Sequence, residues 1–210
     1  MPRKFYRVYH PKKLPLKDLE WDAFQDLLWK AHGELGRWDQ ALRESSRVRK
    51  KKQPLTLALF CKLHRKILLE AKNIKEAGKF RTRQNWIGPE GCSCEEGYFF
   101  PPNFKQVPRY MQNLKQYINS KEKDPLVQLA IFFAQLLIIH PFMDGNGRLA
   151  RLLIPIILHK KEVLSSPIFE MDGYFKKNRG KYFEKLFQIS SKNDWEGWIR
   201  FFLEGIIEKR

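Results

Sequence analysis

The spacing of apolar residues predicts helices in the first third of the chain. Within residues 17–35 they recur at intervals of three and four, the period of an amphipathic helix: Leu19, Ala23, Leu27, Leu28 and Ala31. A shorter helical pattern over 37–48 runs into a basic cluster. Pro54 then predicts the first turn of a third helix, and Gly78 predicts its end.

The pattern changes between residues 79 and 102. Apolar and aromatic residues flank the turn-forming sequence Gly88–Gly91: Trp86, Ile87, Tyr98, Phe99 and Phe100. This arrangement favours a β-hairpin.

Helical patterns fill the rest of the chain. After a helix over 104–118, Asp124 and Pro125 predict the start of a helix that reaches Ile139 and is apolar on all sides, as in the centre of a core. A polar, glycine-rich loop leads directly into the next helix, and two more follow, over 174–190 and 195–207. We therefore expect an all-α fold, a bundle around a central helix-loop-helix, with one hairpin.

Length and composition support one compact domain, or one domain with a short appendage. The chain has 210 residues, 43% of them apolar, so we expect a helical segment over 1–53 and a core domain over 54–210. Three cysteines (Cys61, Cys92 and Cys94) fit a reducing compartment, and we expect cytoplasmic location, with secretion as an effector left open. Apolar runs are too short for membrane insertion, and a signal peptide is not expected.

The charge is strongly basic. Forty Lys and Arg against twenty-three Asp and Glu give a net charge of +17. Three classes of partner fit this charge: nucleic acid, an anionic membrane surface, and a phosphorylated ligand or acidic protein. The densest basic run, 47–52, favours either a nucleic-acid patch or a solvated helix end.

The run from His140 to Arg151 has the features of a polyphosphate site. Gly145 and Gly147 allow backbone N–H groups to turn inward as an anion-binding nest at the N-terminus of the next helix. Arg148 lies three residues before Arg151, so both side chains project from one face of that helix and can bind two phosphates.

Two further groups in the run suggest a reaction. A lone carboxylate beside phosphates, Asp144, suits Mg²⁺. At the other side of the loop, a neutral His140 is placed to take a proton from a hydroxyl. Each residue alone is more often a cap or turn residue, but their combination within twelve positions favours a functional site.

This run resembles the complete signature of Fic (filamentation induced by cAMP) domain proteins, His-x-Phe-x-(Asp/Glu)-Gly-Asn-Gly-Arg-x-x-Arg. The resemblance extends to 78–81 and 86–88, which are similar to the family's flap, and to 16–46, which is similar to the helical segment preceding many Fic cores. It implies the Fic fold and protein AMPylation, the transfer of AMP from ATP to a Tyr, Thr or Ser hydroxyl with release of pyrophosphate.

The resemblance also implies a role for each signature position. His140 would be the base and Asp144 the Mg²⁺ ligand, while Phe142 would anchor the loop. The remaining signature residues would hold the phosphates: Gly145, Asn146 and Gly147 the α-phosphate, Arg148 and Arg151 the β- and γ-phosphates.

Sites outside the signature are implied more weakly. Trp86, Ile87 and Gly88 would dock the target protein. Asn178 and Tyr182 share one face of the predicted helix over 174–190 and would contribute to the adenine pocket, although aromatic residues at this spacing are more often core. The winged-helix domain of some family members is not expected, so we expect no dedicated DNA-binding domain.

One departure concerns regulation. Many Fic proteins carry an inhibitory motif, (Ser/Thr)-x-x-x-Glu-(Gly/Asn), whose Glu pairs with the second signature arginine. The matching stretch here starts at Ser45 and places Arg49 where Glu is expected, followed by Lys50. An arginine at this position would repel Arg151 or help to recruit the triphosphate, so we expect no inhibition by this segment and high automodification. Arg49→Glu is expected to restore inhibition.

The same residues are compatible with other functions. The signature contacts phosphates and not the base, so UMPylation, phosphorylation and phosphocholination remain alternatives. A basic module that binds nucleotide or nucleic acid without catalysis is the alternative from another class. The expected partner is a protein with an accessible hydroxyl, and the net charge favours an acidic surface on it. Self-association is left open.

Overall fold

The computed structural model describes residues 11–43, 54–68, 74–89 and 91–208. Over these residues the regular structure is helical, with short 3-10 turns and no β-strand longer than a single bridge. The α-helices are α1 (Gln25–Arg43), α2 (Leu57–Ile67), α3 (Val107–Asn119), α4 (Pro125–Ile139), α5 (Asn146–Lys160), α6 (Asp172–Lys177), α7 (Arg179–Lys192) and α8 (Trp195–Ile207). The expected all-α bundle is confirmed.

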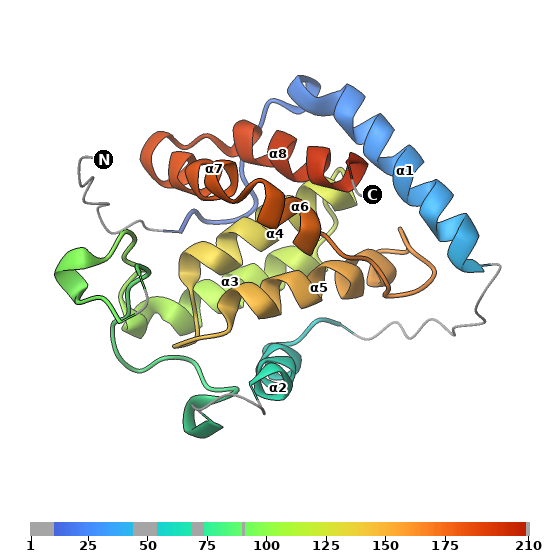
Figure 1. Cartoon of the computed structure of the whole chain (residues 1–210). Helices are drawn as coiled ribbons and strands as arrows, with labels where there is room; N and C mark the ends of the chain where they lie inside the picture. Colours follow the sequence, from blue (N-terminus) through green and yellow to red (C-terminus); the bar gives the residue numbers. More distant parts are fainter. Residues whose placement is uncertain (1–10, 44–53, 69–73, 90, 209–210) are drawn as a thin grey trace.

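Helix α4 forms the centre of the bundle, as the sequence predicts. Asp124 caps it, accepting hydrogen bonds from the N–H groups of Leu126 and Val127, and Pro125 occupies its first turn. Every residue from Leu126 to Ile139 is buried. The helix packs against α3, α5 and α8 (Figure 1), so its apolar side chains meet protein on all sides.

Helix α8 matches its predicted bounds and closes one side of the core. Its apolar stripe is buried as expected: Trp195, Trp198, Ile199, Phe202, Leu203 and Ile206. Trp198 Nε1 donates to the Ala130 carbonyl at 2.8 Å, which joins α8 to α4. Helix α1 packs on α8, whereas α2 packs against α5 on another side of the bundle (Figure 1).

The N-terminal helices differ from the prediction in their bounds. The chain forms a 3-10 turn at Trp21–Phe24 and then one helix, α1, that passes through 36–37 without the predicted break. A Cβ added at Gly36 would meet nothing within 4 Å, so this glycine sits on an open helix face and does not interrupt the hydrogen-bond ladder.

The helix predicted from Pro54 is shorter than expected. Pro54 lies outside it because the side chain of Thr56 accepts from the Leu59 N–H at 3.0 Å and caps α2. Helix α2 ends at Ile67, and a separate 3-10 turn covers Ile74–Glu76 before Gly78, which has φ +76°.

Among the described residues of the predicted hairpin, strand pairing is limited to one antiparallel bridge, between Ile87 and Phe99. The tip between them forms a 3-10 turn, Cys94–Glu96, in which Ser93 and Glu96 make a capping box. Capping bonds to Ser93 thus replace further cross-strand bonds. We call residues 84–103 the flap.

The helix predicted over 174–190 is two helices. Asn178, with φ −103° and ψ 28°, separates α6 from α7. Its side-chain Nδ2 donates to the Tyr174 carbonyl at 3.1 Å, so the asparagine bonds locally at the end of α6, as asparagine commonly does at helix ends. None of the described helices combines the length and apolar character that a membrane span requires.

Candidate functional site

The loop between α4 and α5, residues 140–147, is held by its own side chains. Phe142 is fully buried and anchors it in the core. Asn146 Oδ1 accepts from the Phe142 N–H at 2.9 Å, and its Nδ2 donates to the Phe142 carbonyl at 2.8 Å. With 1% of its surface exposed, the Asn146 side chain clamps the loop. The side chain is thus engaged within the loop, and its predicted contact with a phosphate stays a prediction.

His140 ends α4 in a left-handed conformation, with φ 48° and ψ 60°. Its Nδ1 lies 3.3 Å from the Leu137 carbonyl, which only accepts, so Nδ1 carries the proton and Nε2 keeps a free lone pair. Burial lowers the pKa of His140 to about 4, and the charge of Arg81 adds to this. The imidazole is thus neutral near pH 7, as a general base requires.

Arg81 holds the backbone at His140 through hydrogen bonds. It is 3% exposed, and its guanidinium donates to the carbonyls of His140, at 2.9 Å, and Pro102. Its own N–H donates to the Pro141 carbonyl at 2.9 Å. Burial lowers the pKa of Arg81 to about 10, so the side chain remains a cation at the C-terminal end of α4, where the helix dipole favours one.

Asp144 stands at the start of the expected phosphate nest. Its Oδ1 accepts from the Gly145 N–H at 2.6 Å, and its Oδ2 lies 2.8 Å from Arg148 Nη2. Gly145 has φ +76°, the left-handed region predicted for the nest. A carboxylate therefore occupies two of the donors that the sequence assigns to phosphate oxygens.

Arg151 faces the same helix terminus from one turn further along α5. Its Nη1 lies close to Gly147, since a Cβ added to that glycine would meet Nη1 at 3.2 Å. On its other edge, Nε pairs with Asp172 Oδ1 at 3.0 Å. The predicted phosphate arginines thus lie at one site, and one of them already pairs with a carboxylate that the sequence analysis did not single out.

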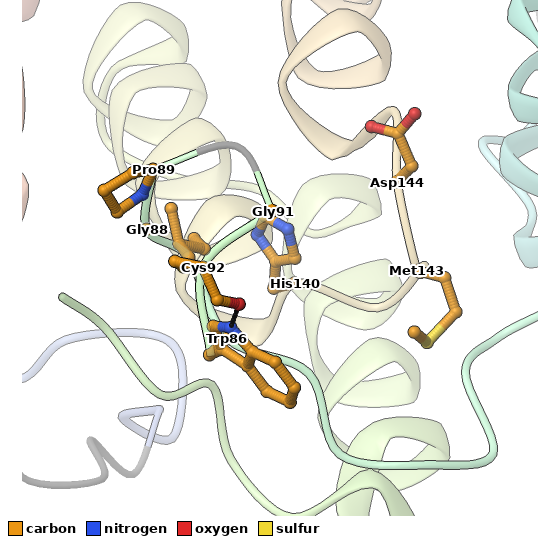
Figure 2. A pocket seen from close by; sticks show the side chains of 9 residues that line it. Trp86, Gly88, Pro89, Gly91, Cys92, His140, Met143 and Asp144 are labelled. Atoms are coloured by element: carbon orange, nitrogen blue, oxygen red, sulfur yellow. Dashed lines mark hydrogen bonds between the residues drawn. The ribbon is translucent and has the colours of Figure 1, made fainter. Parts of the chain in front are cut away.

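The flap and the loop line one pocket. A cavity of about 310 Å³ is bordered by flap residues and by the loop: Trp86, Ile87, Gly88, Pro89, Gly91, Cys92, His140, Met143 and Asp144. In Figure 2, the hydrogen bond from Trp86 Nε1 to the Cys92 carbonyl, 3.1 Å long, closes the flap on itself. The structure thus brings the predicted docking residues next to His140 and Asp144.

The two residues expected near the adenine do not form one exposed helix face. Tyr182 is 9% exposed, and its ring packs among those of Phe175, Trp198 and Phe201. Asn178 lies at the junction of α6 and α7, so the predicted single face is interrupted. The environment of Tyr182 fits the core interpretation that the sequence left open; a contact with adenine stays a prediction.

Three other predictions lie outside the described residues: Ser45, Arg49 and the basic run 47–52. The described residues hold no group of three or more His, Cys, Asp or Glu side chains that could form a metal cage. A single carboxylate is nevertheless what a nucleotide-bound Mg²⁺ requires, because phosphates and waters complete its shell. Asp144, whose side chain is 61% exposed at the pocket, fits that role.

The comparisons with known proteins agree with this geometry. The model of the Fic/DOC family matches residues 54–158, half of the chain. The chain belongs to this family. The match includes α2 to α4, the flap and the signature run.

Two curated relatives of this chain carry the name of protein adenylyltransferase. The chain is 31% identical to "Protein adenylyltransferase fic-1" of Caenorhabditis elegans over 132 residues, which cover 60% of this chain and 24% of that protein. It is 28% identical to "Protein adenylyltransferase Fic" of Drosophila ananassae over 173 residues, 81% of this chain and 31% of that protein. The chain thus matches about a quarter to a third of the length of these relatives.

Solved Fic structures share the fold. A Fic family protein from Desulfovibrio desulfuricans G20 aligns with a TM-score of 0.67 at 18% identity, covering 95% of this chain and 75% of that one. A Fic domain-containing signaling protein from Bacteroides thetaiotaomicron aligns with a TM-score of 0.58 at 20% identity, covering 89% and 67%. At these identities the likeness concerns the fold alone.

Proposed function

We propose that this protein transfers AMP from ATP to a hydroxyl of a target protein. The observation that carries the proposal is the shared pocket, in which a neutral His140 with a free Nε2 lies between the flap and Asp144. The names of the two relatives, adenylyltransferases of C. elegans and D. ananassae, support nucleotidyl transfer.

The residues suggest how the reaction would proceed. A target hydroxyl held at the flap loses its proton to His140 Nε2, while its oxygen attacks the α-phosphorus of ATP. The bond from that phosphorus to the bridging oxygen breaks, and pyrophosphate leaves. Such in-line transfer depends on positioning and on neutralising charge.

The basic end of the site would bind the leaving group. Arg148 and Arg151 project from the first turns of α5 and would take the β- and γ-phosphates in place of their carboxylate partners, Asp144 and Asp172. The N–H groups at the N-terminus of α5 would complete the nest. Mg²⁺, held by Asp144, would neutralise phosphate charge when bound.

Two labels on ATP test this proposal. The protein is incubated with Mg²⁺ and a candidate target, once with α-labelled and once with γ-labelled ATP. AMP transfer predicts label on protein from the α-position only, and its loss in His140→Ala. The control His32→Ala changes a histidine on α1, outside the residues lining the pocket, and should keep the activity.

The other outcomes identify the alternatives. Label from the γ-position means phosphorylation, and incorporation from labelled UTP in preference to ATP means UMPylation. Label from the α-position that persists in His140→Ala would contradict the proposed base. Salt-sensitive nucleic-acid binding without transfer would favour the basic binding module.

A further inference from the structure

A histidine outside the signature supports the loop from behind. His64 lies on α2 and is 1% exposed. Its ring stacks on that of Phe142, with centroids 3.7 Å apart and an interplanar angle of 9°. Although α2 is far from the loop in sequence, this contact places His64 directly against the buried anchor of the candidate site.

The hydrogen bonds of His64 define its tautomer. Nδ1 accepts from the Gly78 N–H at 2.9 Å, so it carries no proton. Nε2 must then carry the proton, and it donates to the Asp144 carbonyl at 2.7 Å. Both ring nitrogens are therefore used, one to hold the chain before the flap and the other to hold the loop.

The bond to Asp144 orients one peptide group. In a trans peptide the carbonyl and the N–H point in opposite directions. The carbonyl between Asp144 and Gly145 points back to His64, so the Gly145 N–H points away from α2. There it donates to the Asp144 carboxylate, which also pairs with Arg148. The N–H thus faces the anion-binding side of the loop.

We propose that His64 is a positioning residue that locks the Asp144–Gly145 peptide with its N–H toward the phosphates of the nucleotide. This inference rests on the proposed function. The lock matters because Gly145, at φ 76° and ψ 3°, matches the third residue of a type II turn. Rotation of the preceding peptide gives the related type I turn and would aim a carbonyl oxygen at the phosphates.

Three substitutions separate the two bonds of His64. Gln reaches as far as Nε2 and can still donate to the Asp144 carbonyl, whereas Asn reaches only as far as Nδ1 and can accept from Gly78. Phe keeps the stacking on Phe142 and loses both bonds. Phe60→Leu is the matched control, because Phe60 is a buried residue of α2 whose ring packs on that of Phe132 on α4.

Nucleotide affinity is the first readout. ATP with Mg²⁺ is titrated into the full chain by calorimetry, in a His140→Ala background that prevents turnover. His64→Asn and His64→Phe lose the bond to the Asp144 carbonyl, so the Gly145 N–H should lose its hydrogen bond to a charged phosphate, which predicts about 10- to 100-fold weaker binding. His64→Gln keeps the bond to the Asp144 carbonyl and should bind ATP within about threefold of the parent. Phe60→Leu should lower Tm without changing the affinity for ATP.

The second readout is the amide resonance of Gly145 in ¹⁵N-labelled protein. In the parent it should shift on addition of ATP, and in His64→Asn it should respond much less. Imidazole ¹⁵N shifts of the parent should show a protonated Nε2 and an unprotonated Nδ1 on His64. The opposite tautomer would overturn the inference without any variant, including the case in which a His64 variant does not fold.

The outcomes separate this inference from the proposed function. If the parent binds ATP, and His64→Asn binds it equally well with an unchanged Gly145 response, the positioning role of His64 is wrong, and the proposal of AMP transfer is unaffected. If the parent does not bind ATP, both fail. Equal weakening in His64→Asn and Phe60→Leu would assign the effect to the stability of α2 and would also overturn the lock.

Discussion

His32 Nε2 lies 2.7 Å from Asp124 Oδ2, which joins α1 to the N-terminus of the buried helix α4. The hydrogen bond that His32 donates to Asp124 raises the pKa of His32 against the opposing effect of burial. Burial alone would raise the pKa of Asp124, but the bond and charge of His32, together with two backbone N–H bonds, lower it. One carboxylate therefore caps the central helix and anchors the N-terminal one.

We expect this pair to make the attachment of α1 depend on pH. The raised pKa of His32 stabilises the fold below the ordinary value of 6.5 and ceases to do so as pH rises through the folded value. The lowered pKa of Asp124 stabilises it above the ordinary value of 3.8 and ceases to do so as pH falls. The pair should thus contribute most between these two values.

Urea unfolding of wild type and His32→Gln measures this contribution. Because His32 is half exposed, we expect a difference of only about 0.5–1 kcal/mol near pH 5.5, and a smaller one at pH 9. In an Asp124→Asn background, which keeps a capping side chain, His32→Gln should have little effect at either pH. A difference that grows toward pH 9 would contradict the assignment.

Arg81 should stabilise the fold through the hydrogen bonds that it donates to backbone carbonyls. Arg81→Met leaves the carbonyls of His140 and Pro102 without their buried donor, so we expect a loss of about 1–3 kcal/mol in the free energy of unfolding. Arg83→Met, at an exposed neighbour paired with Glu76, should change it by less than about 1 kcal/mol. Equal effects of the two substitutions would refute the role of Arg81.

Replacing each of two glycines with alanine should change the stability of the protein in opposite directions. Gly145 has φ +76°, and an added Cβ would meet His64 Nε2 at 3.1 Å, so Gly145→Ala should cost about 1–2 kcal/mol in stability. Gly36 lies inside α1 with nothing within 4 Å, so Gly36→Ala should add about 0.5–1 kcal/mol. Thermal unfolding of both variants checks this, and a stable Gly145→Ala would argue against the observed turn.

The pH dependence of transfer should reflect the lowered pKa of His140. A base must be neutral, and the pKa of His140 is lowered to about 4. We therefore expect kcat/KM to show no bend near pH 6.5 and to fall only as pH approaches 4. A profile from pH 4.5 to 8 on α-labelled ATP measures this. A bend near 6.5 would contradict the lowered pKa of His140.

Local patterns predicted the helices whose signals are contained in their own residues. Asp124 and Pro125 start α4 because a capping carboxylate and a proline without an N–H satisfy the first turn locally. The stripe that begins at Trp195 predicted α8 in full. Two elements that depend on longer-range contacts differ from the prediction. Asn178 ends one helix and precedes another, and the part of the flap that the structure describes forms a single bridge, between Ile87 and Phe99.

The sequence by itself determined the all-α class, the buried central helix and the position of the signature run between two consecutive helices, because these depend on spacing along one or two consecutive elements. The tertiary structure alone decided which distant groups support that site. His64, Arg81 and Asp172 contact the signature run from other elements. Periodicity reports which face of a helix is buried but not what that face meets, so such partners become visible only when the chain is folded.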